Sequence, residues 1–146
     1  MEVQVWLCMC LLIHYTLHAS CYSGKLLFST FSRIMEFDFD TYSATVLLEL
    51  GSTSKYAIDY DYQNRYIYFP RYSYDDIVRF AYPSSNTTLQ TVVQSTSYPS
   101  GIAVDSTNDH LYWVDDYRGQ LSRCNIDGSN VTVLSTFINP WVDLYR

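Results

Sequence analysis

The sequence is poor in basic residues. Lys and Arg together number 9 among 146 residues, they are scattered without a basic run, and the formal net charge is -6. Binding to a nucleic-acid backbone needs clustered Lys and Arg, so the sequence predicts no nucleic-acid partner. Charged residues of both signs make up only 16% of the chain against 48% hydrophobic residues, which excludes a disordered, highly charged tail.

Patterns typical of catalysis and metal binding are also scarce. His110 is the only histidine outside residues 1–20, and neither a Gly-x-Ser-x-Gly elbow nor a Ser-His-Asp set is recognisable. The carboxylate pairs Asp59/Asp61 and Asp115/Asp116 lack the spacing of a calcium loop, and no Cys or His spacing fits zinc. We therefore predict no enzyme activity, no metal site and no cofactor.

The N-terminus differs in composition from the rest of the chain. Residues 3–17 are largely apolar and are followed by the small residues Ala19 and Ser20. Such a run is short for a membrane span and is typical of the core of a signal peptide. We predict a signal peptide over residues 1–20; an uncleaved anchor or a buried element is the alternative.

Cysteine is sparse, with 4 residues in the chain. Cys8 and Cys10 lie in the predicted signal peptide and would be removed with it. Cys21 and Cys124 would remain, an even number suited to an oxidising compartment, and a disulfide between them is one prediction. Pairing of either cysteine with a missing part of a longer protein is the alternative.

Tyrosine is abundant, and the chain repeats itself. Aromatic residues make up 17% of the chain, with 15 Tyr, which favours sheet over helix. Residues 54–88 align without gaps to residues 98–132, an offset of 44, whereas unrelated segments would share only about two positions at about 6% per position. Eight of the 35 aligned positions are identical: Ile58/Ile102, Asp61/Asp105, Asn64/Asn108, Tyr68/Tyr112, Arg79/Arg123, Ser85/Ser129, Asn86/Asn130 and Thr88/Thr132.

Each full copy divides into four short strands separated by turn residues. In the second copy we expect strands at residues 101–105, 110–115, 120–126 and 131–136, with a tight hairpin at Asp127-Gly128. Four antiparallel strands at a period of about 40–45 residues are typical of one β-propeller blade. We predict an all-β chain of about two and a half blades, at residues 25–53, 54–97 and 98–138, with a further blade starting at 139–146.

Three motifs in the second copy resemble the low-density lipoprotein receptor class B repeat, also called the YWTD repeat. They are Pro99–Asp105, Leu111–Asp115 and Asp127–Ser129, with Val114 in place of the family's Thr. The resemblance implies a six-bladed propeller, incomplete here, of the kind found in lipoprotein receptors, Wnt co-receptors and nidogen. It also assigns a structural role to the motif residues, namely Gly101, Ile102, Asp105, Tyr112, Trp113 and Asp115.

The resemblance implies a non-enzymatic, extracellular module that binds a protein ligand, of the lipoprotein or Wnt-pathway type. Such a protein is secreted or lies at the extracellular face of the plasma membrane, and it meets the membrane only through further parts of a longer receptor. The alternatives are a secreted propeller enzyme of the calcium-dependent hydrolase type, a structural matrix protein, or a nonfunctional truncation.

Two equivalent loops carry the side chains that we predict to contact a ligand. Tyr and Arg are typical anchors of protein interfaces, although an ordinary solvated loop is the alternative interpretation. The candidates are Arg71, Tyr72, Tyr74, Tyr117 and Arg118.

Two glycosylation sequons fall at equivalent positions of the repeat, Asn86-Thr87-Thr88 and Asn130-Val131-Thr132. Both precede the expected last strand of their copy, where a glycan would be exposed. We predict glycosylation at Asn86 and Asn130; an Asn retained for its turn conformation is the alternative.

Overall fold

The computed structural model describes residues 24–51, 57–84 and 87–137. The predicted signal peptide, Cys21, Asn86 and the expected blade start at 139–146 lie outside the described residues. Within them the chain forms three antiparallel sheets, and its one helical element is a short 3-10 turn, η1 (Tyr72–Tyr74). The predicted all-β class is therefore confirmed.

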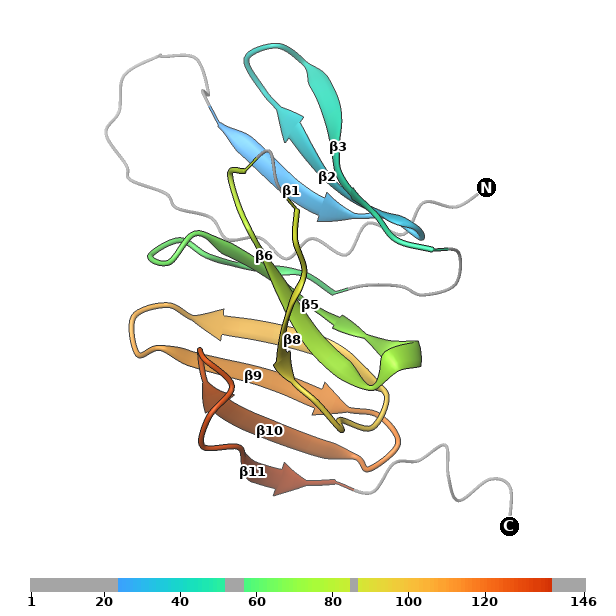
Figure 1. Ribbon diagram of the computed structural model, residues 1–146, viewed down its shortest axis with the longest axis vertical. Coiled ribbons are helices and arrows are strands. Elements are labelled where there is room, and N and C mark those ends of the chain that lie inside the picture. The colour runs from blue at the N-terminus through green and yellow to red at the C-terminus, as the bar shows by residue number, and fades with distance from the viewer. Residues whose placement is uncertain (1–23, 52–56, 85–86, 138–146) are drawn as a thin grey trace. The chain divides into compact units, whose positions relative to one another are not determined.

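Each sheet is a meander in which sequential strands pair (Figure 1). The first sheet has three strands among the described residues, whereas the second and third have four. The strands are β1 (Lys25–Ser29), β2 (Arg33–Asp38) and β3 (Ser43–Glu49) in the first sheet, β4 (Asp59–Asp61), β5 (Tyr66–Arg71), β6 (Asp76–Ala81) and β7 (Gln90–Val93) in the second, and β8 (Pro99–Asp105), β9 (His110–Asp115), β10 (Gln120–Asn125) and β11 (Thr132–Thr136) in the third.

The strands of the third sheet match the predicted ranges to within two residues. The largest difference is at β8, which begins at Pro99 and not at Gly101, because a register shift between these two residues lets the strand pair further with β9. The first sheet forms one compact unit, and the second and third sheets together form another.

The core of the second unit lies between its two sheets. Tyr68, Ile77 and Val93 of the second sheet pack with residues of the third, notably Trp113 and Cys124. Burial alternates along β9, because successive side chains of a strand point to opposite faces. Trp113 is therefore buried, and its neighbours along the strand are half-buried on the other face.

The turns after β4 and β8 explain two of the repeat identities. The Asp61 and Asp105 carboxylates each accept hydrogen bonds from the two backbone amides two and three residues later. Each also accepts one from an Asn side chain, Asn64 at 2.8 Å and Asn108 at 2.7 Å. The repeated Asp and Asn therefore hold equivalent turns.

Candidate functional site

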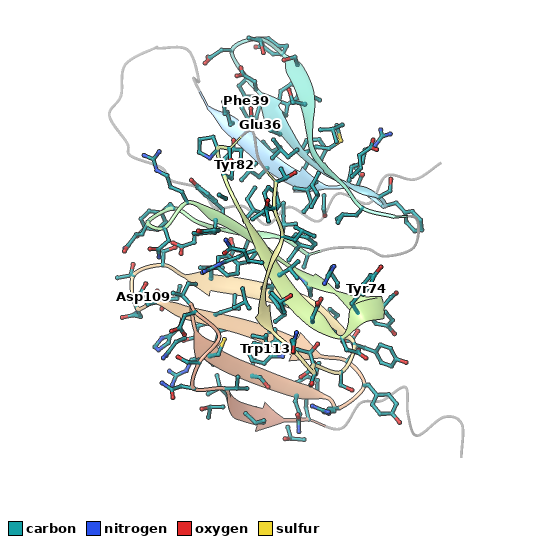
Figure 2. The ribbon with its side chains drawn as sticks, viewed as in Figure 1. Glu36, Phe39, Tyr74, Tyr82, Asp109 and Trp113 are labelled. Carbon is teal, nitrogen blue, oxygen red and sulfur yellow. The ribbon has the colours of Figure 1, made fainter. Side chains whose placement is uncertain are left out.

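Three loops of the second unit meet at one end of its two sheets. They are the β5–β6 turn, the β9–β10 turn and the β7–β8 connection. Asp75 joins the first to the last: its carbonyl accepts from the Thr96 amide at 2.9 Å, and its carboxylate accepts from the Tyr98 amide at 3.1 Å. The Asp116 amide in turn donates to the Tyr98 carbonyl at 3.1 Å. Figure 2 shows Tyr74 at this loop end of the strands and Asp109 at the opposite end.

An aromatic cluster, consisting of Tyr72, Tyr98 and Tyr117, lies on this loop end. Tyr72 stacks on Tyr98 with ring centroids 4.5 Å apart and an interplanar angle of 21°, and Tyr117 meets Tyr98 edge to face at 5.7 Å. The three rings are 42%, 40% and 66% exposed. Because aromatic side chains lose little rotamer freedom on contact, such a cluster is suited to anchoring a partner.

Tyr98 holds the cluster together in an unfavourable backbone conformation. Its φ is 54°, in the left-handed region that bulky residues rarely adopt. The hydrogen bonds to Asp75 and Asp116 fix it there. Strain held in place by its surroundings is typical of functional loops, and here it places the Tyr98 ring between Tyr72 and Tyr117.

Arg71 is engaged within the protein. Its Nε donates to Asp76 Oδ1 at 2.8 Å and its Nη2 to Asp76 Oδ2 at 2.5 Å, a two-point ion pair. Its guanidinium also lies 4.4 Å from the centre of the Tyr74 ring. We read Arg71 as a residue that positions Tyr74, whose side chain is 70% exposed.

An open hollow of about 390 Å³ borders the same loops. Tyr74 and Arg118, two of the predicted contact residues, come from different sheets and line it together. Thr96 Oγ1 is buried here without a hydrogen-bond partner in the described part of the chain. The other lining residues are polar or acidic: Asp75, Asp76, Gln94 and Ser95.

The YWTD-like motif lies beneath this surface. Trp113 Nε1 donates to Asp115 Oδ2 at 3.2 Å, and Asp115 Oδ1 accepts from the Ser97 amide at 2.8 Å. Both side chains are 3% exposed. Asp115 therefore ties the buried Trp to the β7–β8 connection that carries Tyr98, and it is inaccessible to a ligand.

The other motif residues have separate surroundings. Ile102 packs against the core, and a methyl group at Gly101 would make only ordinary contact with Val114, at 3.9 Å or more. Asp105 holds the turn described above, and Tyr112 lies on the sheet face opposite Trp113.

The remaining predicted sites can be placed only in part. Cys124 is a buried free thiol, 1% exposed, and its predicted partner Cys21 lies outside the described residues. Asn130 is exposed with φ 57°, a conformation that Asn tolerates better than most residues. Among the described residues, no three His, Cys, Asp or Glu side chains come together as a metal site would require. That same part of the chain contains no helix long and apolar enough to cross a membrane.

The structure thus gathers all five predicted contact residues at one end of two neighbouring sheets. The sequence reasoning missed Tyr98 and Asp75, which connect them. The only sequence signal at Tyr98 is its place directly before Pro99, at the predicted start of a blade. Nothing in the sequence shows that the β7–β8 connection bonds to the β5–β6 turn.

The chain is similar to nidogens. Mouse nidogen-2 is 27% identical over 92 residues, which are 63% of this chain and 7% of nidogen-2. The crystal structure of a nidogen/laminin complex matches with a TM-score of 0.67 and 20% identity over 76% of this chain and 44% of the other. No family model matches the sequence.

The fold also occurs in enzymes. A virginiamycin B lyase from Staphylococcus aureus matches with a TM-score of 0.59 and 16% identity, covering 82% of this chain and 40% of the lyase chain. The chain therefore spans less than half of the relatives that it matches. These likenesses support β-propeller blades of the YWTD-like kind, and they do not single out lipoprotein receptors.

Proposed function

We propose that the chain is a non-enzymatic, extracellular protein-binding module, and that the partner is bound by the aromatic cluster and the adjoining hollow. The observation that carries this proposal is the convergence of exposed Tyr side chains from two sheets on one surface, with Tyr72 stacked on Tyr98. Tyr and Arg are the residues in which interface binding energy concentrates.

The surface also has the mixed character of a protein interface. The aromatic cluster supplies apolar area, while Asp75, Asp76 and Arg118 place charged residues in the lining of the adjoining hollow. A hollow that is open and largely polar suits a protein loop better than an enclosed small molecule, which usually binds in an apolar cavity.

The likeness to nidogen supports an extracellular setting and a protein partner, because the matching nidogen structure is a complex with laminin. We propose a matrix protein of that kind as the first partner to test. Ligands of the lipoprotein and Wnt-pathway type are the alternatives, and they belong in the same assay. Secretion and glycosylation at Asn86 and Asn130 are further parts of this proposal, and counting thiols before and after reduction tests the predicted Cys21–Cys124 disulfide.

Surface plasmon resonance with immobilised laminin tests the site. We expect the full chain to bind and Tyr117→Ala with Arg118→Ala to weaken binding by roughly tenfold or more, because loss of an anchor residue costs about 1–2 kcal/mol or more. Tyr62→Ala is the matched control, since Tyr62 is 50% exposed and lies in the turn after β4, at the opposite end of the strands.

The outcomes separate the ligand from the site. One outcome is that laminin does not bind, while a lipoprotein or Wnt-type ligand binds and the Tyr117/Arg118 substitutions weaken that binding. In that case the proposed site is supported and the proposed matrix partner is wrong. If a ligand binds and the Tyr62 and Tyr117/Arg118 variants behave alike, the site is wrong.

A further inference from the structure

Two polar side chains of the second sheet, Tyr68 and Arg79, form hydrogen bonds to the third sheet, and we call this pair the latch. Tyr68 and Arg79 lie directly opposite each other on β5 and β6, and Arg79 Nη1 donates to the Tyr68 hydroxyl at 2.9 Å. Both groups also donate to the backbone carbonyl of Ile126 in the third sheet, Tyr68 at 3.3 Å and Arg79 at 3.4 Å. The Arg79 guanidinium lies 4.3 Å from the centre of the Tyr66 ring. The two side chains of the second sheet thus share one carbonyl acceptor in the third.

The third sheet carries the same set of side chains on its other face. Tyr112 and Arg123 lie directly opposite each other on β9 and β10. His110 meets Tyr112 edge to face at 6.1 Å, much as Tyr66 meets Tyr68 at 6.4 Å. Alternation along the strands puts this set on the face away from Trp113 and the core.

This outer face of the third sheet is only half-buried. Along β9 and β10, the residues on this face alternate with buried residues that point into the core. We call it the open face, and its residues are Tyr112, Val114, Leu121 and Arg123.

The first sheet presents the complementary kind of face. Leu26 lies opposite Phe37, and Phe28 lies opposite Met35, so the four side chains share one face of the sheet, and each is half-buried. We call it the receiving face. In the pairing of β1 with β2, these four residues hold the positions that Leu111, Trp113, Ser122 and Cys124 hold in the pairing of β9 with β10. The equivalent face of the third sheet is the one that packs against Tyr68.

The Ile126 carbonyl, which accepts both hydrogen bonds from the latch, has a counterpart in the first sheet. The Ile126 amide donates to Asp109 at the start of the β9–β10 ladder, and the Phe39 amide donates to Gly24 at the equivalent place of the β1–β2 ladder. Phe39, labelled in Figure 2, therefore matches Ile126, and its side chain is 40% exposed.

From these equivalences we infer that the open face of one copy binds the receiving face of a second copy, with Tyr112 and Arg123 donating to the Phe39 carbonyl. The contact is head to tail, because it joins unlike faces of the two copies. The chain itself holds both halves of the contact, which favours a second copy over an unrelated partner.

The mass of the full 146-residue chain in solution tests the inference. We expect light scattering to give an assembly of at least two copies, the smallest being a dimer of twice 17.0 kDa. Tyr112→Ala with Arg123→Ala is expected to raise the dimer dissociation constant by roughly tenfold or more, since Tyr and Arg are typical anchor residues. Two controls are expected to leave the dimer intact: Leu134→Thr on the exposed edge strand β11, and Tyr117→Ala in the ligand-binding surface.

A mixing experiment tests the head-to-tail arrangement. Met35→Glu damages the receiving face, and the Tyr112/Arg123 variant damages the open face. Each variant alone is expected to stay largely monomeric, whereas an equimolar mixture keeps one intact junction per pair and forms a heterodimer. Circular dichroism and urea unfolding of each variant check that it is folded.

Three results would overturn the inference. One is a cooperatively folded monomer of 17.0 kDa, which would leave the open face to further blades of a longer chain. Another is a dimer that is insensitive to the Tyr112/Arg123 substitutions. The third is a mixture of folded variants that fails to associate. None of these results bears on the ligand-binding surface, because Tyr117 and Arg118 lie outside both faces.

Discussion

At the scale of single residues, the same residue type serves different ends according to its strand position. Tyr68 is fully buried and donates a hydrogen bond to the neighbouring sheet. Tyr112 lies on the half-buried open face, and Tyr117 is 66% exposed in a loop. The side-chain period of a strand and the ends of the strands separate these roles. An abundance of Tyr therefore indicates sheet, and the place of each Tyr in its strand indicates packing or binding.

Cys124 shows what burial does to a reactive group. Burial, assisted by the charge of Asp127, raises the pKa of its thiol from 9.0 to about 11. The folded state thus favours the neutral thiol. This contribution to stability is complete below pH 9, and it is lost as the pH rises through 11.

We predict that Cys124 is unreactive until the chain unfolds. Thiol counts with a chromogenic disulfide reagent at neutral pH should be equal for the wild-type chain and Cys124→Ala in buffer, and should differ by one in denaturant. The free energy of unfolding should fall between pH 9 and 11 by on the order of 2 kcal/mol more in the wild type than in Cys124→Ala. A fast-reacting Cys124 thiol in the native chain would contradict this. A thiol that appears only after reduction would show that Cys124 is in a disulfide, as the predicted Cys21–Cys124 pairing requires.

At the scale of elements, the β10–β11 hairpin depends on a glycine. Gly128 has φ +91°, and a methyl group there would meet the carbonyl oxygen of Val92 in the neighbouring sheet. The Asp127 carboxylate, which accepts from the Ser129 amide at 2.9 Å, completes the turn. The hairpin signal in the sequence was thus a correct guide to the turn, and the close approach to β7 is an additional reason for the glycine.

We predict that Gly128→Ala lowers the free energy of unfolding by about 2 kcal/mol or more, because it combines an unfavourable φ with a clash against backbone. Gly101→Ala is the matched control in the same sheet, since the added methyl group would lie at least 3.9 Å from Val114. Urea unfolding measures both variants. Equal stabilities of the two would show that the hairpin can move away from β7 at little cost.

At the scale of the whole molecule, the first and the third sheet each have a face with apolar side chains that is only half-buried. The open face and the receiving face are each half-buried, whereas equivalent side chains between the second and third sheets, such as Leu111 and Trp113, are at most 3% exposed. Exposed apolar faces of this kind indicate contacts with further protein.

If a second copy covers these faces, the chain's stability depends on its own concentration. We predict that an increase of about a hundredfold in protein concentration raises the Tm by roughly 5 °C. Differential scanning calorimetry at several concentrations measures this, and the Tyr112/Arg123 double variant should show a smaller slope. A Tm independent of concentration in the wild type would argue against coupled folding and association.

The sequence alone determined the elements and their repetition. Asp61 and Asp105, each followed by Asn three residues later, set equivalent turns, and Asp127-Gly128 set a hairpin, because these signals act within a few residues of chain. The four-strand pattern and its period then predicted propeller blades, and the structure confirmed the all-β class.

Only the tertiary structure decided which side chains meet. Arg71 was predicted to contact a ligand, and an ion pair with Asp76 fixes it beneath Tyr74. Tyr98 drew no attention in the sequence, and its ring joins Tyr72 to Tyr117 across two sheets. The contacts of Tyr98 depend on how one sheet lies against the next, and Tyr72, Tyr98 and Tyr117 are 19 or more positions apart along the chain, so no local sequence signal predicts that their rings meet.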